Sequence, residues 1–299
     1  MFNQIFGKYL VDSGRLTEEQ LQDVIESEAE VRVKLGLIAV AEKLLTKEQA
    51  DEINQLQTIM DKRFGDIAVM KGYLNEETVA SLLKKQANVY MLFCQTLIDK
   101  EIMTLEEVDQ ALADYQTMEG FTHSDMDDLV SGDVDRTVRI FLPQDSALDA
   151  QLCGIMIRTV LRIINENAYV TKAFMVNELT VDNFAMQKLL GDHTIYVGFA
   201  GASDSLLNVA EPFANEEFER VDMDALDAVG EFINCVNGLF ASDLSVKNIN
   251  VDMAPPEYFD SPVKLSGEQI CVFPVVIGAE PINFILSVDS SIQVTPIGE

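Results

Sequence analysis

The chain has 299 residues, of which 48% are hydrophobic, so it is long enough for two domains with separate cores. Its formal net charge of −29 arises from 21 basic and 50 acidic side chains. Nucleic acids and anionic membranes carry negative charge themselves, so this composition disfavours both as partners.

The N-terminal sequence MFNQIFGKYLVDSGRLTEEQ has no basic segment followed by a sustained apolar run, and no stretch of 18 apolar residues occurs. These features predict a cytoplasmic protein without membrane insertion. The four cysteines are widely spaced and form no cluster with histidine, so no metal site is expected. The two histidines lie in no setting typical of a hydrolase built on a nucleophile and a histidine base.

An internal repeat opens the chain. Apolar residues recur every 29 residues at the start of four units, at Phe6, Leu35, Phe64 and Phe93. Eleven residues further on, each unit has a residue that favours helix N-caps: Thr17, Thr46, Asn75 and Thr104. Three of the four units add a Gln or Glu three residues later, which predicts a capping box. The repeat predicts a short helix, a turn and a longer helix in each unit.

The turn of the repeat contains glycine in units one and three, at Gly14 and Gly72, as expected where a helix ends in a positive φ. Units two and four have Lys43 and Glu101 at this position. On the physics of repeats alone, this region is a helical bundle or short solenoid for packing or partner contacts.

Units two and three, KLGLIAVAEKLLTKEQADEINQLQ and RFGDIAVMKGYLNEETVASLLKKQ, resemble the MshEN domain of type II secretion and pilus ATPases. That domain binds cyclic-di-GMP through a tandem motif. The resemblance implies a helical repeat domain over residues 1–116 and the nucleotide-binding residues Lys34, Gly36, Gln57, Arg63, Gly65, Gly72 and Gln86. The sequence departs from the motif at Lys34, where the family has arginine, and lysine cannot stack on a base or fork onto phosphate as arginine does.

The amino-acid composition changes after the repeats. Residues 117–135 combine Gly, Ser and six acidic side chains with few apolar residues, which is typical of an exposed linker. We therefore predict an acidic linker over 117–143 and a second domain over 144–299.

Helices and strands are mixed in this second domain. We expect helices over 147–167, 205–214 and 222–243, and strands over 193–201, 244–253, 267–279 and 281–289. Consecutive strands that end in a hairpin predict an α+β fold rather than a doubly wound parallel sheet. No glycine-rich phosphate loop joins a strand to a helix, so a nucleotide-dependent enzyme is not expected.

The predicted helix over 222–243 has an unusual polar face. Its interior contains Gly230 and Gly238, and glycine costs about 1 kcal/mol relative to alanine there. A face that is merely solvated would be better served by Glu, Lys or Ala. The sequence therefore favours a recognition role for the polar residues that recur at steps of three or four: Asp224, Asp227, Glu231, Asn234 and Asn237.

Within GEFINCVNG, the pattern Glu231, Asn234, Gly238 resembles the active-site helix of the CheC/CheX/FliY chemotaxis phosphatases. The order of helices and strands extends the resemblance over about 145–290. CheC-like proteins carry the motif on two helices, whereas the earlier helix here has Arg162 and Asn165 without a Glu-x-x-Asn pattern. The single-site, CheX-like form is therefore the closer match.

This second resemblance implies a bacterial signalling protein that hydrolyses the phospho-aspartate of a CheY-like receiver domain. Glu231 would pair with a lysine of the receiver, and Asn234 would position the attacking water as a glutamine does in GTPases. The receiver brings its own Mg²⁺, so the chain needs no cofactor, and cyclic-di-GMP is a candidate regulatory ligand. Two alternatives stay open. One is a non-catalytic adaptor that docks a regulator or a second copy of itself as a homodimer; the other is a cyclic-di-GMP receptor with an oligomerisation module.

Overall fold

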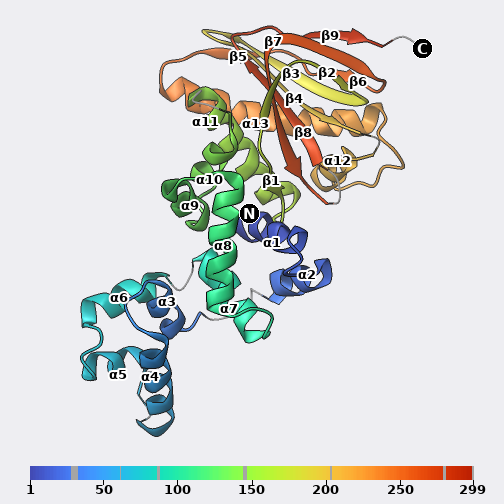
Figure 1. Ribbon diagram of the computed structural model, residues 1–299. Helices are drawn as coiled ribbons and strands as arrows, with labels where there is room; N and C mark the ends of the chain where they lie inside the picture. Colours follow the sequence, from blue (N-terminus) through green and yellow to red (C-terminus); the bar gives the residue numbers. More distant parts are fainter. Residues whose placement is uncertain are drawn as a thin grey trace. The chain divides into compact units, whose positions relative to one another are not determined.

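The computed structural model describes residues 1–27, 33–60, 62–85, 88–143, 147–202, 204–278 and 281–297. The chain divides into two compact units, Phe2–Gly132 and Asp133–Glu299 (Figure 1). The first unit is helical and the second combines a sheet with helices. The predicted fold class, a helical repeat region followed by an α+β domain, is thus confirmed.

Four helix pairs make up most of the first unit, and each pair corresponds to one sequence repeat. The pairs are α1 (Phe2–Asp12) with α2 (Glu18–Ser27), α3 (Leu35–Ala41) with α4 (Lys47–Met60), α5 (Phe64–Met70) with α6 (Glu76–Lys84), and α7 (Val89–Asp99) with α8 (Leu105–Glu119). In space the repeats pair as one with four and two with three, because α1 packs on α7 and α8, while α3 packs on α5 and α6. Phe6 lies at the centre of the first pairing, against the rings of Phe2, Tyr9, Phe93 and Tyr115.

The predicted caps and turns are present in every repeat. Thr104 and Glu107 form a complete capping box, and the same reciprocal hydrogen bonds join Thr17 to Gln20 and Thr46 to Gln49. All four turn residues adopt a positive φ, at 72° for Gly14 and Gly72 and at 56° for Lys43 and Glu101. The turn geometry is therefore common to all four repeats, although only two of them have glycine.

The segment 117–143 contains the end of α8 and two further short helices, and is not an exposed linker. Helix α9 (His123–Val130) begins with a capping box between Thr122 and Asp125, and α10 (Val134–Phe141) begins with Asp133 as its N-cap. The acidic residues that suggest a linker thus serve as helix caps, while Met126, Leu129, Val138 and Phe141 are buried. The two units divide at Gly132 and Asp133, within the expected linker, so α10 belongs to the second unit.

The second unit is built on an antiparallel sheet whose strand path is β1-β7-β8-β4-β3-β5. Strands β2 and β9 also pair with the long β7, and β6 pairs with β3. The strands are β1 (Tyr169–Val170), β2 (Phe174–Val181), β3 (Asn183–Gly191), β4 (Thr194–Gly201), β5 (Val251–Met253), β6 (Glu257–Phe259), β7 (Val263–Val276), β8 (Pro281–Val288) and β9 (Gln293–Pro296).

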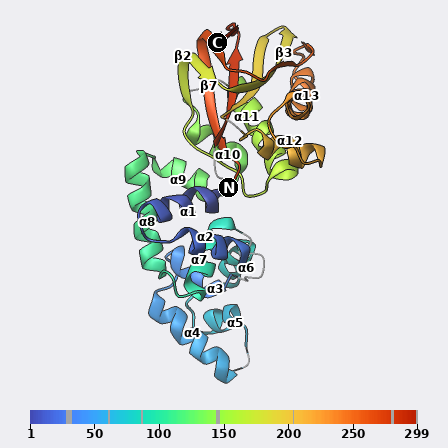
Figure 2. The ribbon, with the colours of Figure 1, turned by 90° about the vertical axis from the view of Figure 1, so that its right-hand side faces the viewer.

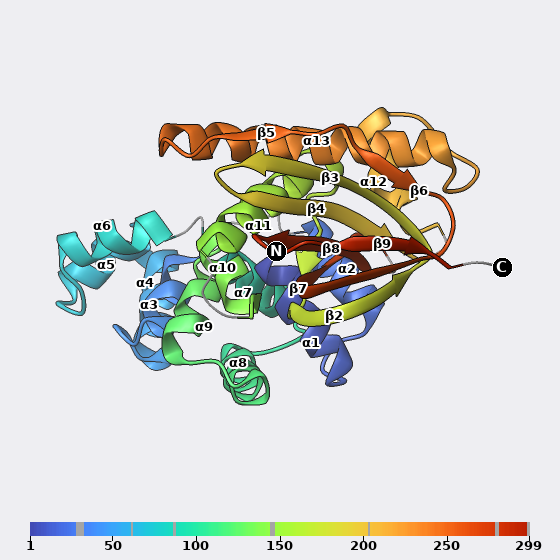
Figure 3. The same ribbon diagram turned by 90° about the horizontal axis from the view of Figure 1, so that it is seen from above.

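Three helices cover one side of this sheet (Figure 2): α11 (Ala147–Thr159), which continues as a π-helical turn over Val160–Ile164, α12 (Leu207–Ala214) and α13 (Met223–Val246). Helix α13 packs on β3, β4, β5 and β6, and Figure 3 shows it running alongside β3 and β5. The rings of Phe199, Phe232 and Phe284 join helix and sheet in the core.

The strand expected over 244–253 is mostly wrong. Helix α13 continues to Val246, and only Val251–Met253 is extended. The helix ends because Asn248 takes a positive φ of 60°, a conformation that asparagine tolerates better than most residues.

Candidate functional site

Helix α13 lies between the core of the second unit and solvent, and its two predicted site residues differ in exposure. Asp222 caps the helix by accepting hydrogen bonds from the backbone N–H groups of Asp224 and Ala225. Glu231 is exposed, whereas Asn234, one turn further on, is partly buried. The two side chains are close enough in sequence to reach a single partner group, because residues three apart are neighbours on a helix surface.

Glu231 lies on an acidic part of this helix. Its carboxylate has no hydrogen bond or ion pair to any residue that the structure describes. One turn before it, Asp227 accepts a hydrogen bond of 2.9 Å from the hydroxyl of Tyr258 on β6. Burial, the bond to Asp227 and the nearby carboxylate of Glu231 together raise the pKa of Tyr258 to about 12. The exposed end of this surface therefore suits a cationic group of a partner.

The side chain of Asn234 is hydrogen-bonded to a residue of β3. Its Oδ1 accepts a hydrogen bond of 2.9 Å from Nε2 of Gln187, which is only 2% exposed. Asn237 is fully buried and also bonds to Gln187, so it does not share the exposed face with Glu231 as its spacing suggests. Gln187 was not predicted from the sequence as a site residue. The only available signal was a glutamine within the largely apolar run NFAMQKLLG, which forms β3.

The two glycines of α13 have different surroundings. A Cβ atom at Gly230 would lie 2.4 Å from Cε1 of Tyr258, so this glycine makes room for the tyrosine ring. At Gly238 the nearest atom to such a Cβ would be Cε of Met253, at 4.0 Å. The packing of the folded chain therefore requires glycine at 230 but leaves open space at 238.

In the helical unit, five of the seven residues expected to bind a nucleotide line one pocket of about 700 Å³. They are Lys34, Gly36, Gln57, Arg63 and Gly65. Gly72 does not line it and instead forms the turn after α5, while Gln86 lies outside the described residues. Lys34 and Arg63 occupy the same position in their repeats, as N-cap residues of α3 and α5.

The two cations of this pocket are not equivalent. The ammonium of Lys34 pairs with Asp99 at 2.7 Å, whereas exposed Arg63 has no partner among the described residues. The glycines are explained by packing alone, because a Cβ at Gly36 would lie 2.9 Å from the ring of Phe64 and one at Gly65 would lie 2.6 Å from Val79. Arg63 is therefore the residue of this pocket that an anionic ligand would engage most directly.

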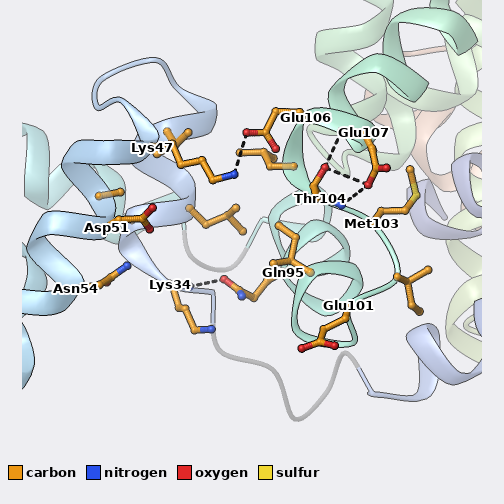
Figure 4. Close-up of a pocket in the computed structure, with 17 residues that line it drawn as sticks. Lys34, Lys47, Asp51, Asn54, Gln95, Glu101, Met103, Thr104, Glu106 and Glu107 are labelled. Carbon is orange, nitrogen blue, oxygen red and sulfur yellow. Dashed lines mark hydrogen bonds and ion pairs between the residues drawn. The ribbon is translucent and has the colours of Figure 1, made fainter.

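A second pocket of about 450 Å³ lies between the hairpins of repeats two and four (Figure 4). The backbone N–H of Lys34 donates to Gln95 across it, and Lys47 pairs with Glu106 at 3.4 Å. Both lysines that line it are thus paired with carboxylates, and Asp51 and Glu101 add further negative charge. This pocket suits an anion less well than the one at Arg63.

Within the described residues, no group of three or more His, Cys, Asp or Glu side chains is placed to hold a metal ion. No helix in the same part of the chain is both long and apolar enough to cross a bilayer. All four cysteines are free thiols.

Residues 184–272 match the family model described as "Chemotaxis phosphatase CheX". No curated protein sequence matches the chain. Among solved structures, a chemotaxis protein CheX from Desulfovibrio desulfuricans is 13% identical with a TM-score of 0.42, over 48% of this chain and 99% of that one. A CheC-like superfamily protein from Shewanella sp. PV-4 is 17% identical with a TM-score of 0.41, over 48% and 99%. A CheX–CheY–BeF3–Mg²⁺ complex from Borrelia burgdorferi is 16% identical with a TM-score of 0.37, over 49% and 97%.

The matched residues begin in β3 and run through α13 into β7. They include Glu231 and Asn234, whereas the helical repeats lie outside the match. The C-terminal unit therefore carries a CheX-like domain.

Proposed function

We propose that the C-terminal unit hydrolyses the phospho-aspartate of a CheY-like receiver domain. The observation that carries this proposal is the presence on α13 of an exposed carboxylate, Glu231, beside an anchored carboxamide, Asn234, inside the segment that matches the CheX family model. Glu231 has no partner within the described part of the chain. Glu231 forms an ion pair with a lysine of the receiver and fixes its register. Asn234 then lies beside the phosphoryl group.

The reaction needs little covalent chemistry from this chain. Water attacks phosphorus in line with the acyl oxygen, the bond between phosphorus and that oxygen breaks, and both protons of the water end on the product phosphate. The aspartate carboxylate of the receiver is released. The Mg²⁺ on the receiver stabilises the phosphoryl charge, and the carboxamide of Asn234 orients the water. This mechanism requires no histidine, nucleophile or metal ion from the chain itself.

Substitutions on α13 test the mechanism with a panel of phosphorylated receiver domains. Asn234→Ala should lower kcat for the cognate receiver about 100-fold with little change in binding, because its contact is worth most in the transition state. Glu231→Ala should weaken binding as well as turnover, because an ion pair also forms in the ground state. Ser245→Ala, at an exposed site on the same helix, is the matched control and should change neither. Turnover that is unaffected by Asn234→Ala contradicts the mechanism.

The same assay separates an enzyme from an adaptor. A non-catalytic adaptor would bind the phosphorylated receiver tightly and leave its dephosphorylation rate at the intrinsic value. That result with the unmodified protein would favour the adaptor, and the two α13 variants would then differ only in affinity.

For the helical unit we propose that the pocket at Arg63 binds cyclic-di-GMP and so regulates the protein. The observation in favour is that five of the residues implied by the MshEN resemblance line this one pocket, where Arg63 has no partner among the residues that the structure describes. Arginine can form paired hydrogen bonds with phosphate and stack on a guanine base.

Calorimetry with cyclic-di-GMP tests this assignment. Arg63→Ala should abolish binding without unfolding the domain, because Arg63 is exposed. The neighbouring exposed Lys62 gives a control with the same change of charge, and Lys62→Ala should retain binding. If the unmodified protein shows no heat of binding at high micromolar nucleotide, the pocket is not a cyclic-di-GMP site and the repeats serve for packing or partner contacts.

A further inference from the structure

Three side-chain amides meet beneath the exposed face of α13. Gln187 on β3 donates from Nε2 to the backbone carbonyl of Ala254 and to Oδ1 of Asn234, both at 2.9 Å. Its Oε1 accepts from Nδ2 of Asn237, also at 2.9 Å. Gln187 and Asn237 are 2% and 0% exposed, so water does not compete freely for these bonds.

The orientation of all three amides follows from one backbone group. A carbonyl oxygen can only accept, so the end of Gln187 that faces Ala254 must be the NH2 group. The second hydrogen of Nε2 then requires an acceptor, and Asn234 must present Oδ1 to it. The Oε1 of Gln187 requires a donor in turn, which is Nδ2 of Asn237. Among the described residues, the network therefore leaves two amide ends without a partner: Nδ2 of Asn234 on the side toward solvent, and Oδ1 of the fully buried Asn237.

We propose that Gln187 is a positioning residue that fixes Asn234 with its Nδ2 directed away from the network and toward the reacting groups. This inference rests on the proposed phosphatase function. It assigns Asn234 the role of a hydrogen-bond donor. One N–H bonds to the oxygen of the attacking water, which keeps a lone pair free for phosphorus, and the other can reach a phosphoryl oxygen.

An asparagine without such a partner can present either end of its amide. Rotation by half a turn would replace the two donors by Oδ1, which can only accept from the water and cannot bond to a phosphoryl oxygen. A fixed orientation therefore removes an unproductive state before the receiver binds. A purely structural role predicts instead that Gln187 contributes to stability and not to the rate.

Gln187→Met tests this role, because methionine has similar length and neither donates nor accepts as an amide does. We expect kcat to fall about 10- to 100-fold while KM changes less than about twofold. Ser287→Ala is the matched control, because Ser287 is also 2% exposed and its hydroxyl bonds to the carbonyl of Ser290, away from the amide network. Calorimetric melting of each variant separates loss of stability from loss of rate.

A double substitution identifies the route of the effect. In the Asn234→Ala background, Gln187→Met should lower kcat no further, since the group that Gln187 orients is absent. A further drop of the same size in that background would overturn the proposal. If Asn234→Ala slows turnover and Gln187→Met leaves kcat unchanged, the positioning role fails while the phosphatase function stands. If neither substitution matters, the phosphatase mechanism itself fails, and the positioning role fails with it.

A measurement on the unmodified protein covers the case in which Gln187→Met does not fold. Side-chain amide hydrogen exchange by NMR should be fast at Nδ2 of Asn234 and slow at Nε2 of Gln187 and Nδ2 of Asn237. Slow exchange at Nδ2 of Asn234 would place that group inside the network and overturn the proposed orientation.

Discussion

The two glycines of α13 allow a direct comparison of helix propensity with packing. Replacing either by alanine should favour the helix by about 1 kcal/mol, because alanine loses less backbone entropy on folding. At Gly238 nothing opposes this gain, since the added methyl would lie no closer than 4.0 Å to its nearest neighbour, Met253. We therefore expect Gly238→Ala to stabilise the C-terminal unit by about 0.5–1 kcal/mol.

At Gly230 the same substitution meets the body of the Tyr258 ring. The added Cβ would lie 2.4 Å from Cε1 and 2.9 Å from Cζ, so the ring must move. Overpacking of this kind costs about 1–3 kcal/mol, and displacement of the ring also removes the hydrogen bond to Asp227, worth about 1 kcal/mol. These costs exceed the gain in propensity, and Gly230→Ala should destabilise the unit by about 1–3 kcal/mol.

Differential scanning calorimetry of the full chain measures both effects, through the transition assigned to the C-terminal unit. For a unit of this size, about 1 kcal/mol corresponds to a shift in Tm of roughly 2–4 °C. Gly238→Ala should raise Tm and Gly230→Ala should lower it. An equal rise in both variants would show that Tyr258 yields without cost and would refute the packing argument.

Three further results are expected. Lys43→Gly should stabilise the helical unit by about 0.5–1 kcal/mol in urea denaturation, because Lys43 holds a φ of 56° that glycine adopts without strain; a loss of stability would contradict this. Thr104→Ala should cost about 1 kcal/mol in the same assay, since it removes one half of a complete capping box, and an unchanged midpoint would count against the cap. The pKa of Tyr258 is raised from 10.0 to about 12, so its contribution to stability should be complete below pH 10 and decline as the pH rises toward 12. Tyr258→Phe should remove that part of the pH dependence. If the variant has the same pH profile of stability as the unmodified protein, Tyr258 does not contribute to it.

The sequence predicted the helical repeats well because their determinants are local. A cap residue, its partner three positions later and an apolar face all lie within one helix, so spacing alone reveals them. The same local signals were present in 117–143, at Thr122 with Asp125 and at Asp133, but the acidic composition masked them. The spatial pairing of repeat one with repeat four depends on contacts between residues far apart in the chain, which a period of 29 residues does not encode.

The sequence allowed prediction of the candidate site residues that lie on α13, but not of the residue on another element that contacts them. Glu231 and Asn234 could be proposed from the sequence because they share one helix, whereas Gln187 lies 47 residues before Asn234 on β3. Helical spacing put Asn237 on the polar face with them, yet its amide is buried because Gln187 offers it a partner inside. A buried hydrogen bond between two elements thus overrides the amphipathic pattern of either one.

The glycines and polar residues of α13 fall into two groups: those whose presence is explained by contacts within the folded chain, and those whose presence is not. Gly230 accommodates Tyr258, and Asn237 satisfies Gln187, so both are accounted for by contacts within the unit. Gly238 faces open space, and the carboxylate of Glu231 has no partner among the described residues. No contact within the described residues explains the propensity cost of Gly238 or the unpaired charge of Glu231. Contact with a second molecule is the best explanation for both. Asn234 lies between the two groups, with its Oδ1 bonded to the fold and its Nδ2 left for that molecule.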